Sequence, residues 1–257
     1  TSVNAASQSV AVSGSVMVPD PAITDPSVSS LNGFIYAQGA GPSSAQSFTT
    51  GGIFLNAPIG VKAPVDYEIS TTSGSGYTDS LTLSPTTGIV ATSTIYVRLK
   101  AGLNAGDFNN QNVIISTDGV ASKSVTCNGT VVVSTINSSS VASLSGFAYN
   151  SYSGGPSAEQ SFTISASNLL QNLKAKASAN YQVSLTSGTG FADSINIVPV
   201  SYNVSTTTIH VRLKSGLSAN SYSGTVTLSS PNANSQTVSL SGTVVTPVLS
   251  SPVPNPL

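Results

Sequence analysis

The chain has 257 residues, of which only 7% are charged, and its net charge at pH 7 is −1. Eight Lys and Arg residues cannot make the basic patch of a nucleic-acid-binding protein, and the single cysteine excludes an intramolecular disulfide framework. Hydrophobic residues make up 39% of the chain, with no run long enough for a membrane-spanning helix, so folded domains are expected and membrane insertion is not.

Residues 1–17 have the pattern of a strand that closes a domain. The run Ser-Gln-Ser-Val-Ala-Val-Ser-Gly-Ser-Val at 7–16 matches Ser-Gln-Thr-Val-Ser-Leu-Ser-Gly-Thr-Val at 235–244. We therefore expect residues 1–17 to be the last strand of a preceding repeat, which pairs with an upstream domain, pairs with another chain or is disordered in this chain. Residues 18–28 follow as an expected Pro-rich linker, because a residue before proline favours extended backbone.

The first full domain is expected to span residues 29–134. Short runs alternate apolar and polar residues and are separated by turn residues, which is typical of a β-sandwich. A turn is predicted at 73–76, because two glycines there adopt positive φ at little cost. The expected strands are 31–36, 45–49, 60–63, 67–71, 80–84, 93–100, 113–116 and 123–133.

One of these strands occurs twice, and the repeat predicts a second domain. Ile-Tyr-Val-Arg-Leu-Lys-Ala-Gly-Leu at 95–103 returns as Ile-His-Val-Arg-Leu-Lys-Ser-Gly-Leu at 209–217. The period of two is that of a half-buried strand. The fold class is thus predicted as all-β, with two tandem Ig-like β-sandwich domains. A linker at 135–140, a second domain at 141–246 and a Pro-rich linker to a further domain at 247–257 complete the expected organisation.

The inward positions of the repeated segments predict the core. Apolar residues that recur in both copies are the best candidates for burial. They are Phe48/Phe162, Ile95/Ile209, Val97/Val211, Leu99/Leu213 and Leu103/Leu217.

The residues of this sequence do not favour an enzyme. The only histidine, His210, is replaced by Tyr96 in the other copy, and catalysis would need a positioned partner group. Cys127 aligns with inward positions and is expected to be a small buried side chain. No His/Cys cluster suits zinc and no acidic loop suits calcium, so no metal and no cofactor is predicted.

The outward residues of the repeated strand form a candidate contact surface. Each copy places a ring and two cations on one face, which could bind sugars or another chain. The simpler interpretation is a solvated strand face that keeps sheets from pairing with one another. The residues are Tyr96, Arg98 and Lys100 in the first copy and His210, Arg212 and Lys214 in the second.

Four motifs resemble a known family. The segments 12–16, 41–49, 67–77 and 95–103 are similar to Ig-like tandem repeats of large secreted Bacteroidetes proteins, which include gliding-motility adhesins exported by type IX secretion. The resemblance implies a non-catalytic structural segment of a long extracellular cell-surface adhesin or filament. Its implied partners are neighbouring repeats, identical chains, polysaccharide or cell-surface components. Two alternatives stay open: a spacer or binding module of a secreted hydrolase, and a subunit of a strand-exchanged self-assembling filament.

The same resemblance implies two modification sites. Asp79-Ser80-Leu81 and Asp193-Ser194-Ile195 occupy equivalent positions and resemble the O-glycosylation motif of exported Bacteroidetes proteins, which would place glycans on Ser80 and Ser194. Strand alternation favours exposed serines if Leu81 faces the core. The alternative is that both aspartates bond to turn amides and the serines are ordinary strand residues.

Overall fold

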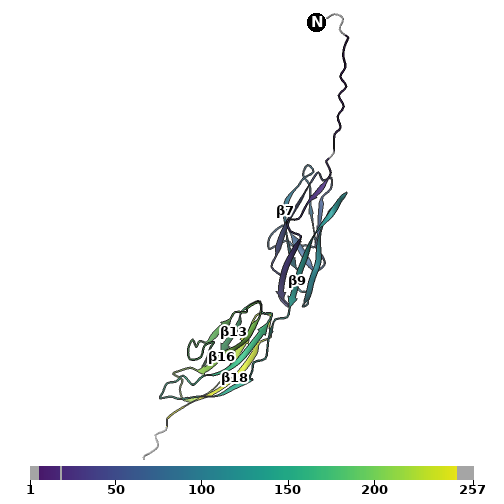
Figure 1. The fold of residues 1–257 in the computed structure, drawn as a ribbon. Helices are drawn as coiled ribbons and strands as arrows, with labels where there is room; N and C mark the ends of the chain where they lie inside the picture. Colours follow the sequence, from purple (N-terminus) through teal and green to yellow (C-terminus); the bar gives the residue numbers. More distant parts are fainter. Residues whose placement is uncertain (1–5, 18, 248–257) are drawn as a thin grey trace, which may run out of the picture. The chain divides into compact units, whose positions relative to one another are not determined.

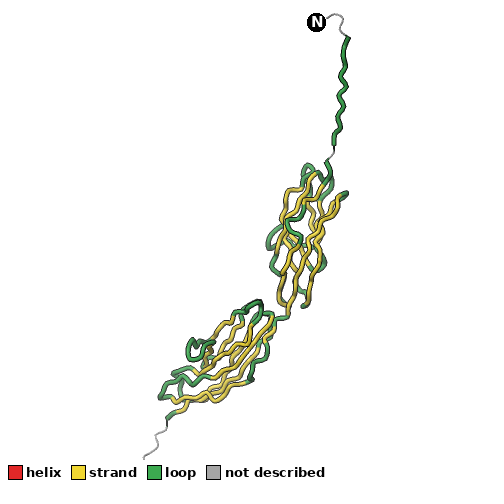
Figure 2. Tube along the Cα trace, viewed as in Figure 1, coloured by secondary structure: helices red, strands yellow, loops and turns green. Residues whose placement is uncertain are grey.

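The computed structural model describes residues 6–17 and 19–247. Every regular element in these two ranges is a β-strand (Figure 2). The strands form four sheets, two from residues 22–132 and two from residues 135–245 (Figure 1). The period-two patterns of the sequence have therefore produced two β-sandwiches.

The first sandwich pairs a four-stranded sheet of order β1-β3-β7-β5 with a five-stranded sheet of order β2-β9-β8-β4-β6. Its strands are β1 (Ala22–Thr24), β2 (Ser30–Ala37), β3 (Gln46–Ile53), β4 (Ile59–Lys62), β5 (Tyr67–Ser70), β6 (Ser80–Leu83), β7 (Val90–Leu99), β8 (Gly106–Thr117) and β9 (Val120–Val132). All eight strands expected from the sequence are present, most of them longer than predicted.

The second sandwich repeats this arrangement, with sheets of order β10-β12-β16-β14 and β11-β18-β17-β13-β15. Its strands are β10 (Thr135–Ile136), β11 (Ser143–Asn150), β12 (Gln160–Ser167), β13 (Leu173–Ala177), β14 (Tyr181–Ser184), β15 (Ser194–Ile197), β16 (Val204–Leu213), β17 (Asn220–Ser229) and β18 (Gln236–Val245). Position for position, each strand of the first sandwich has its counterpart here.

The strand order is that of an Ig-like sandwich. The order β10-β12-β16-β14 corresponds to the A-B-E-D sheet of immunoglobulin domains, and β18-β17-β13 corresponds to G-F-C. The first strand is split between the sheets, because β10 pairs antiparallel with β12 whereas β11 pairs parallel with β18. One detail differs: β14, in the place of strand D, precedes the edge strand β15 along the chain. The predicted fold class is confirmed.

Two segments that the sequence predicted as linkers contain strands. Within residues 18–28, β1 pairs with β3, and within residues 135–140, β10 pairs with β12. Each short strand buries one isoleucine, Ile23 at 5% exposure and Ile136 at 3%. A strand of two or three residues has no period to detect, so only the recurrence of this isoleucine between the copies could have indicated it.

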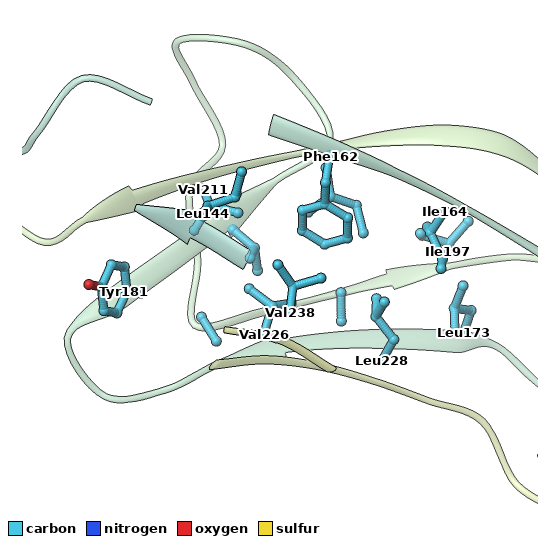
Figure 3. Close-up of a cluster of buried hydrophobic side chains, with 14 of the residues drawn as sticks. Leu144, Phe162, Ile164, Leu173, Tyr181, Ile197, Val211, Val226, Leu228 and Val238 are labelled. Atoms are coloured by element: carbon cyan, nitrogen blue, oxygen red, sulfur yellow. The ribbon is translucent and has the colours of Figure 1, made fainter. Parts of the chain in front are cut away.

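The predicted core is confirmed at four of its five pairs of positions. The paired Phe, Ile, Val and Leu residues of β3, β7, β12 and β16 are at most 2% exposed, and Cys127 is fully buried. Figure 3 shows Phe162, Val211 and Leu228 packed between the two sheets of the second sandwich. Leu103 and Leu217 are only half-buried, because they follow the ends of β7 and β16 and lie at the rim of the core.

A glycine in the last strand lets the sheets approach closely. A Cβ on Gly242 would lie 2.7 Å from Leu213 Cδ1 and 2.8 Å from Phe147 Cβ. Gly129 holds the same position against Leu99 in the first sandwich, again with a 2.7 Å approach. These distances are too short for any side chain, so glycine is needed for this packing.

A tyrosine hydroxyl fixes the end of the repeated strand in each copy. Tyr149 Oη donates to the carbonyl of Lys214 at 2.9 Å and accepts from the amide of Leu217 at 2.9 Å. Tyr36 does the same for Lys100, at 2.8 Å, and for Leu103, at 3.0 Å. The hydroxyl thus satisfies a carbonyl and an amide that the strand no longer pairs.

We predict that Tyr149→Phe destabilises the second sandwich by about 1–3 kcal/mol, because it leaves a part-buried carbonyl and amide without their hydroxyl partner. Peptide-resolved hydrogen exchange should show faster exchange in β16 and unchanged exchange in β7. Tyr152→Phe is the matched control, since Tyr152 is 91% exposed. Equal effects of the two variants would contradict this role of the hydroxyl.

Residues 6–17 belong to no sheet of the described chain. Val10, Val12 and Val16 are exposed there. Their matches in the last strand of the second sandwich, Val238, Leu240 and Val244, are all buried. The segment therefore carries the pattern of a last strand without making its contacts, and its assignment to another sandwich stays a prediction.

Deleting residues 1–17 is expected to leave the thermal unfolding of both sandwiches unchanged, because residues 6–17 are exposed and neither sandwich uses them as a strand. Circular dichroism melting of the full and shortened chains provides the measurement. A clear drop in the melting temperature of the shortened chain would show that the segment stabilises a sandwich of its own chain.

Candidate functional site

The predicted contact residues lie on the outward face of β7 and β16. Tyr96 and Arg98 alternate with buried residues along β7, and His210 and Arg212 do so along β16. Lys100 and Lys214 directly follow the ends of these two strands. All six are half-buried. Both strands lie inside four-stranded sheets, so side chains of the neighbouring strands flank them. The alternation of buried and outward residues is as expected from the sequence. That the outward residues contact sugars or another chain stays a prediction.

The two cations of the second copy are engaged within their own sandwich. Arg212 lies opposite Gln182 on β14 and donates to Gln182 Oε1 through Nε at 3.3 Å and Nη2 at 3.1 Å. Its guanidinium also stacks 3.9 Å from the centroid of the Phe191 ring. Lys214 Nζ is 2.7 Å from Asp193 Oδ1. In the first copy Arg98 and Lys100 are likewise not free.

His210 contacts a carboxylate that the sequence analysis did not single out. Its Nδ1 lies 3.2 Å from Glu159 Oε1, at the start of β12. Glu159 also accepts from the Ser187 hydroxyl and, at 2.9 Å, from the Gly188 amide. These hydrogen bonds, first that of Ser187 and then that of Gly188, lower the pKa of Glu159 below its ordinary value of 4.5. The carboxylate therefore ties the β14–β15 turn to β12.

The arrangement around His210 lacks the features of a nucleophilic site. Ser187 donates to the carboxylate of Glu159, and His210 contacts that same carboxylate, so the imidazole is not placed as the base for the serine. In the described residues no group of three His, Cys, Asp or Glu side chains could hold a metal ion. The contacts of His210, Ser187 and Gly188 with Glu159 suit a structural role on the strand face better than acid–base chemistry.

Both predicted glycosylation sites lie on edge strands. Ser80 begins β6 and Ser194 begins β15, the last strands of their sheets. Ser80 is exposed and Ser194 is half-buried. Asp193 pairs with Lys214, which differs from the turn-amide bond that the alternative interpretation expected. Ser80 is thus more accessible to a modifying enzyme than Ser194, and both glycosylation sites stay predictions.

The second sandwich contains a groove that was not predicted from the sequence. Its volume is about 1010 Å³, and it lies among the loops that follow β12, β15 and β17. Lys174, Asn196 and Tyr202 are among its lining residues. The chain brings these residues together from three separate loops and strands, so no local motif announces the groove.

A comparison between the two copies could have revealed this groove. Tyr202 stands where the first copy has Gly88, as the equivalent backbone bonds from Leu169 to Tyr202 and from Leu55 to Gly88 show. The exposed Val198 and Val200 stand where the first copy has Ser84 and Thr86. The first copy exposes apolar side chains elsewhere in these loops. They are Phe54 and Ile89, where the second copy has Asn168 and Asn203.

We predict that Glu159→Gln loosens the β14–β15 turn at neutral pH, because the neutral amide binds Ser187 and Gly188 less strongly than the carboxylate does. Since folding lowers the pKa of Glu159, its stabilisation is present above the ordinary glutamate pKa. It is lost as pH falls through the lower folded value.

Hydrogen exchange of residues 185–190, measured in wild type and variant from neutral to acidic pH, tests this expectation. The difference between the two proteins should shrink as Glu159 is protonated. Asp20→Asn, at an exposed carboxylate outside all the sheets, is the control. A difference that persists unchanged into strong acid would exclude the charge as its cause.

In the described residues no helix is long and apolar enough to cross a membrane. No protein-family model matches the chain, and no match was found among the curated proteins. Solved structures that resemble it include the CupB6 tip adhesin from Pseudomonas aeruginosa, at 10% identity and TM-score 0.30, covering 88% of this chain and 97% of that one. The C-terminal domain of the Streptococcus pyogenes antigen I/II-family protein AspA matches at 10% identity and TM-score 0.32, covering 88% and 100%.

The complex of Dpr11 IG1 with DIP-gamma also resembles the chain, at 16% identity and TM-score 0.29, covering 88% of this chain and 100% of that one. At these identities and TM-scores the likenesses carry no argument about activity or partners. The strand order is therefore the basis for classification: the chain is a tandem pair of Ig-like β-sandwiches.

Proposed function

We propose that the chain is a non-catalytic structural or adhesive segment of a longer array of Ig-like repeats on a cell surface. The observation that carries the proposal is the repetition itself, because the second sandwich reproduces the strand order of the first. It also reproduces two contacts: the close packing at Gly129 and Gly242, and the tyrosine clamp, in which Tyr36 or Tyr149 binds the end of the repeated strand. Only Val133 and Ser134 separate β9 from β10. Domains that follow one another so directly are typical of arrays in which copy number sets length.

The surface chemistry supports an array more than a catalyst. In the second copy both cations contact side chains of the same sandwich, and His210 contacts Glu159, so the polar groups of this face bind one another. Charged residues are scarce over the whole chain, which leaves a surface of hydroxyls and amides. An extracellular adhesin or filament, of the kind found in gliding motility, is the parent that the resemblance to Bacteroidetes repeats implies.

Mass-spectrometric mapping of the intact parent protein from its native host tests the proposal. Surface proteolysis of whole cells should release peptides of this chain, and the parent should contain further copies of the repeat. If the parent protein joins only these two sandwiches to a hydrolase domain, the adhesin proposal is wrong and the chain is a spacer of a secreted hydrolase.

The strand-exchanged filament is the second candidate, favoured by the exposed valines of residues 6–17. Such a segment could complete the sheet of a neighbouring molecule by strand addition. Sedimentation velocity over a range of protein concentrations distinguishes the two candidates. Growth of large species that is abolished by deleting residues 1–17 would favour the filament, and a constant sedimentation coefficient would exclude self-assembly through this segment.

We expect O-glycans on Ser80 and Ser194, because both serines begin edge strands, where a glycan would hinder pairing with other sheets. Peptide mapping of the native protein should find a hexose-bearing mass on each serine, lost in Ser80→Ala and Ser194→Ala. Ser93 and Thr207, which are polar residues of inner strands, serve as controls. Unmodified peptides that cover both serines would exclude the modification.

A further inference from the structure

The groove of the second sandwich has the lining of a ligand site. Its volume of about 1010 Å³ is at the upper end of the range for small-molecule pockets. Two of its lining residues are exposed apolar side chains, Val198 at 69% and Tyr202 at 49% exposure. Ligand pockets are lined mainly by apolar and aromatic side chains with a few polar groups among them.

The polar part of the lining consists of amides, hydroxyls and one cation. Amide side chains both donate and accept hydrogen bonds, as sugar hydroxyl groups do. The residues that supply these groups are Gln171, Asn172, Asn196, Ser229 and Lys174. Lys174 is exposed and has no ion pair with any described residue, and no carboxylate lines the groove. The lining therefore contains no negative group that would repel an anion, and Lys174 supplies a positive charge that could attract one.

These groove residues are not inherited features of the repeat. At the positions of Gln171, Asn172 and Lys174 the first copy has Ala57, Pro58 and Gly60. The buried positions of the flanking strands stay apolar in both copies, since Leu173 corresponds to Ile59 and Ile197 to Leu83. The second copy thus keeps its core and changes the loops above it.

Tyr202 occupies a backbone position at which a tyrosine is strained. The turn Val200–Asn203 has two central residues at positive φ, Ser201 at 48° and Tyr202 at 64°. The first copy forms the same turn with Gly88 at 79°, the residue that adopts this conformation most easily. Folding stability gives no reason for a tyrosine where glycine adopts the backbone more easily, and such outliers gather at binding sites.

We propose that this groove binds an acidic oligosaccharide, with a sugar ring stacked on Tyr202 and a carboxylate held by Lys174. The ring offers a flat apolar face to the C–H groups of a pyranose. Gln171, Asn172 and Asn196 bind its hydroxyl groups, and Lys174 supplies the charge that discriminates acidic from neutral sugars. The inference adds a ligand to the second sandwich and does not depend on the length or type of the parent protein.

The test uses the whole chain with tetragalacturonate as the acidic probe and cellotetraose as the neutral one, by isothermal titration calorimetry at low salt. Tyr202→Gly restores the residue of the first copy, so it should melt no lower than wild type. We expect it to weaken tetragalacturonate binding by about fivefold or more through loss of the stacked ring. Lys174→Gln should weaken it by about threefold, with the difference fading at high salt.

Lys176→Gln is the matched control, because Lys176 is exposed two residues further along β13 and does not line the groove. Lys176→Gln should weaken tetragalacturonate binding less than Lys174→Gln does, because Lys176 attracts the probe only from a distance. Three results would each overturn the proposal: no binding at millimolar tetragalacturonate, equally tight binding of cellotetraose, or equal affinities of wild type and Tyr202→Gly. If Tyr202→Gly changes the sedimentation coefficient and leaves glycan binding unchanged, the oligosaccharide proposal is likewise wrong and the groove is a protein–protein contact.

Discussion

The period-two alternation of β7 and β16 is the constraint on which each sandwich depends. Each strand places Ile, Val and Leu against the opposite sheet, with a ring and an arginine between them on the outward face and a lysine directly after the strand. A shift by one residue would bury the charges and expose the core. The glycine opposite Leu99 or Leu213 and the tyrosine clamp at the strand's end fix this register from both sides.

The buried half and the exposed half of the repeated strand have diverged to different extents. Inward residues are identical between the copies, because close packing tolerates few changes in volume. Among the outward residues the arginine and the lysine are the same in both copies, and the ring position differs. Where the second copy has His210 and its partner Glu159, the first copy has Tyr96 and Ala45, so the histidine and the carboxylate occur together in one copy. The loops above the core also differ, and in the second copy they form the groove.

The sequence predicted those features that are local or repeated. The eight main strands of the first sandwich follow from short alternating runs, and the core follows from positions that stay apolar in both copies. The β1 and β10 strands were missed because a single buried isoleucine has no periodicity. The contacts of Glu159 with Ser187 and His210 join residues 28 and 51 positions apart in the chain, a pairing that no local pattern reveals.

The groove shows how an internal repeat can act as its own reference. The Thr87–Gly88 turn of the first sandwich has the same backbone conformation as the Ser201–Tyr202 turn, with a glycine in place of the tyrosine. The fold therefore does not require a tyrosine at position 202. A non-glycine residue in this conformation costs about 1–3 kcal/mol, and the exposed Val198 and Val200 return little of it by burial. Tyr202, the exposed Val198 and Lys174 thus lie together at this groove, and Lys174 has no ion pair with any described residue. The first sandwich also has an exposed aromatic residue at positive φ, Phe54 at 57°, so the strained ring alone does not distinguish the groove. Its combination with Lys174 and the amide side chains does, and a ligand that covers the groove accounts for that combination.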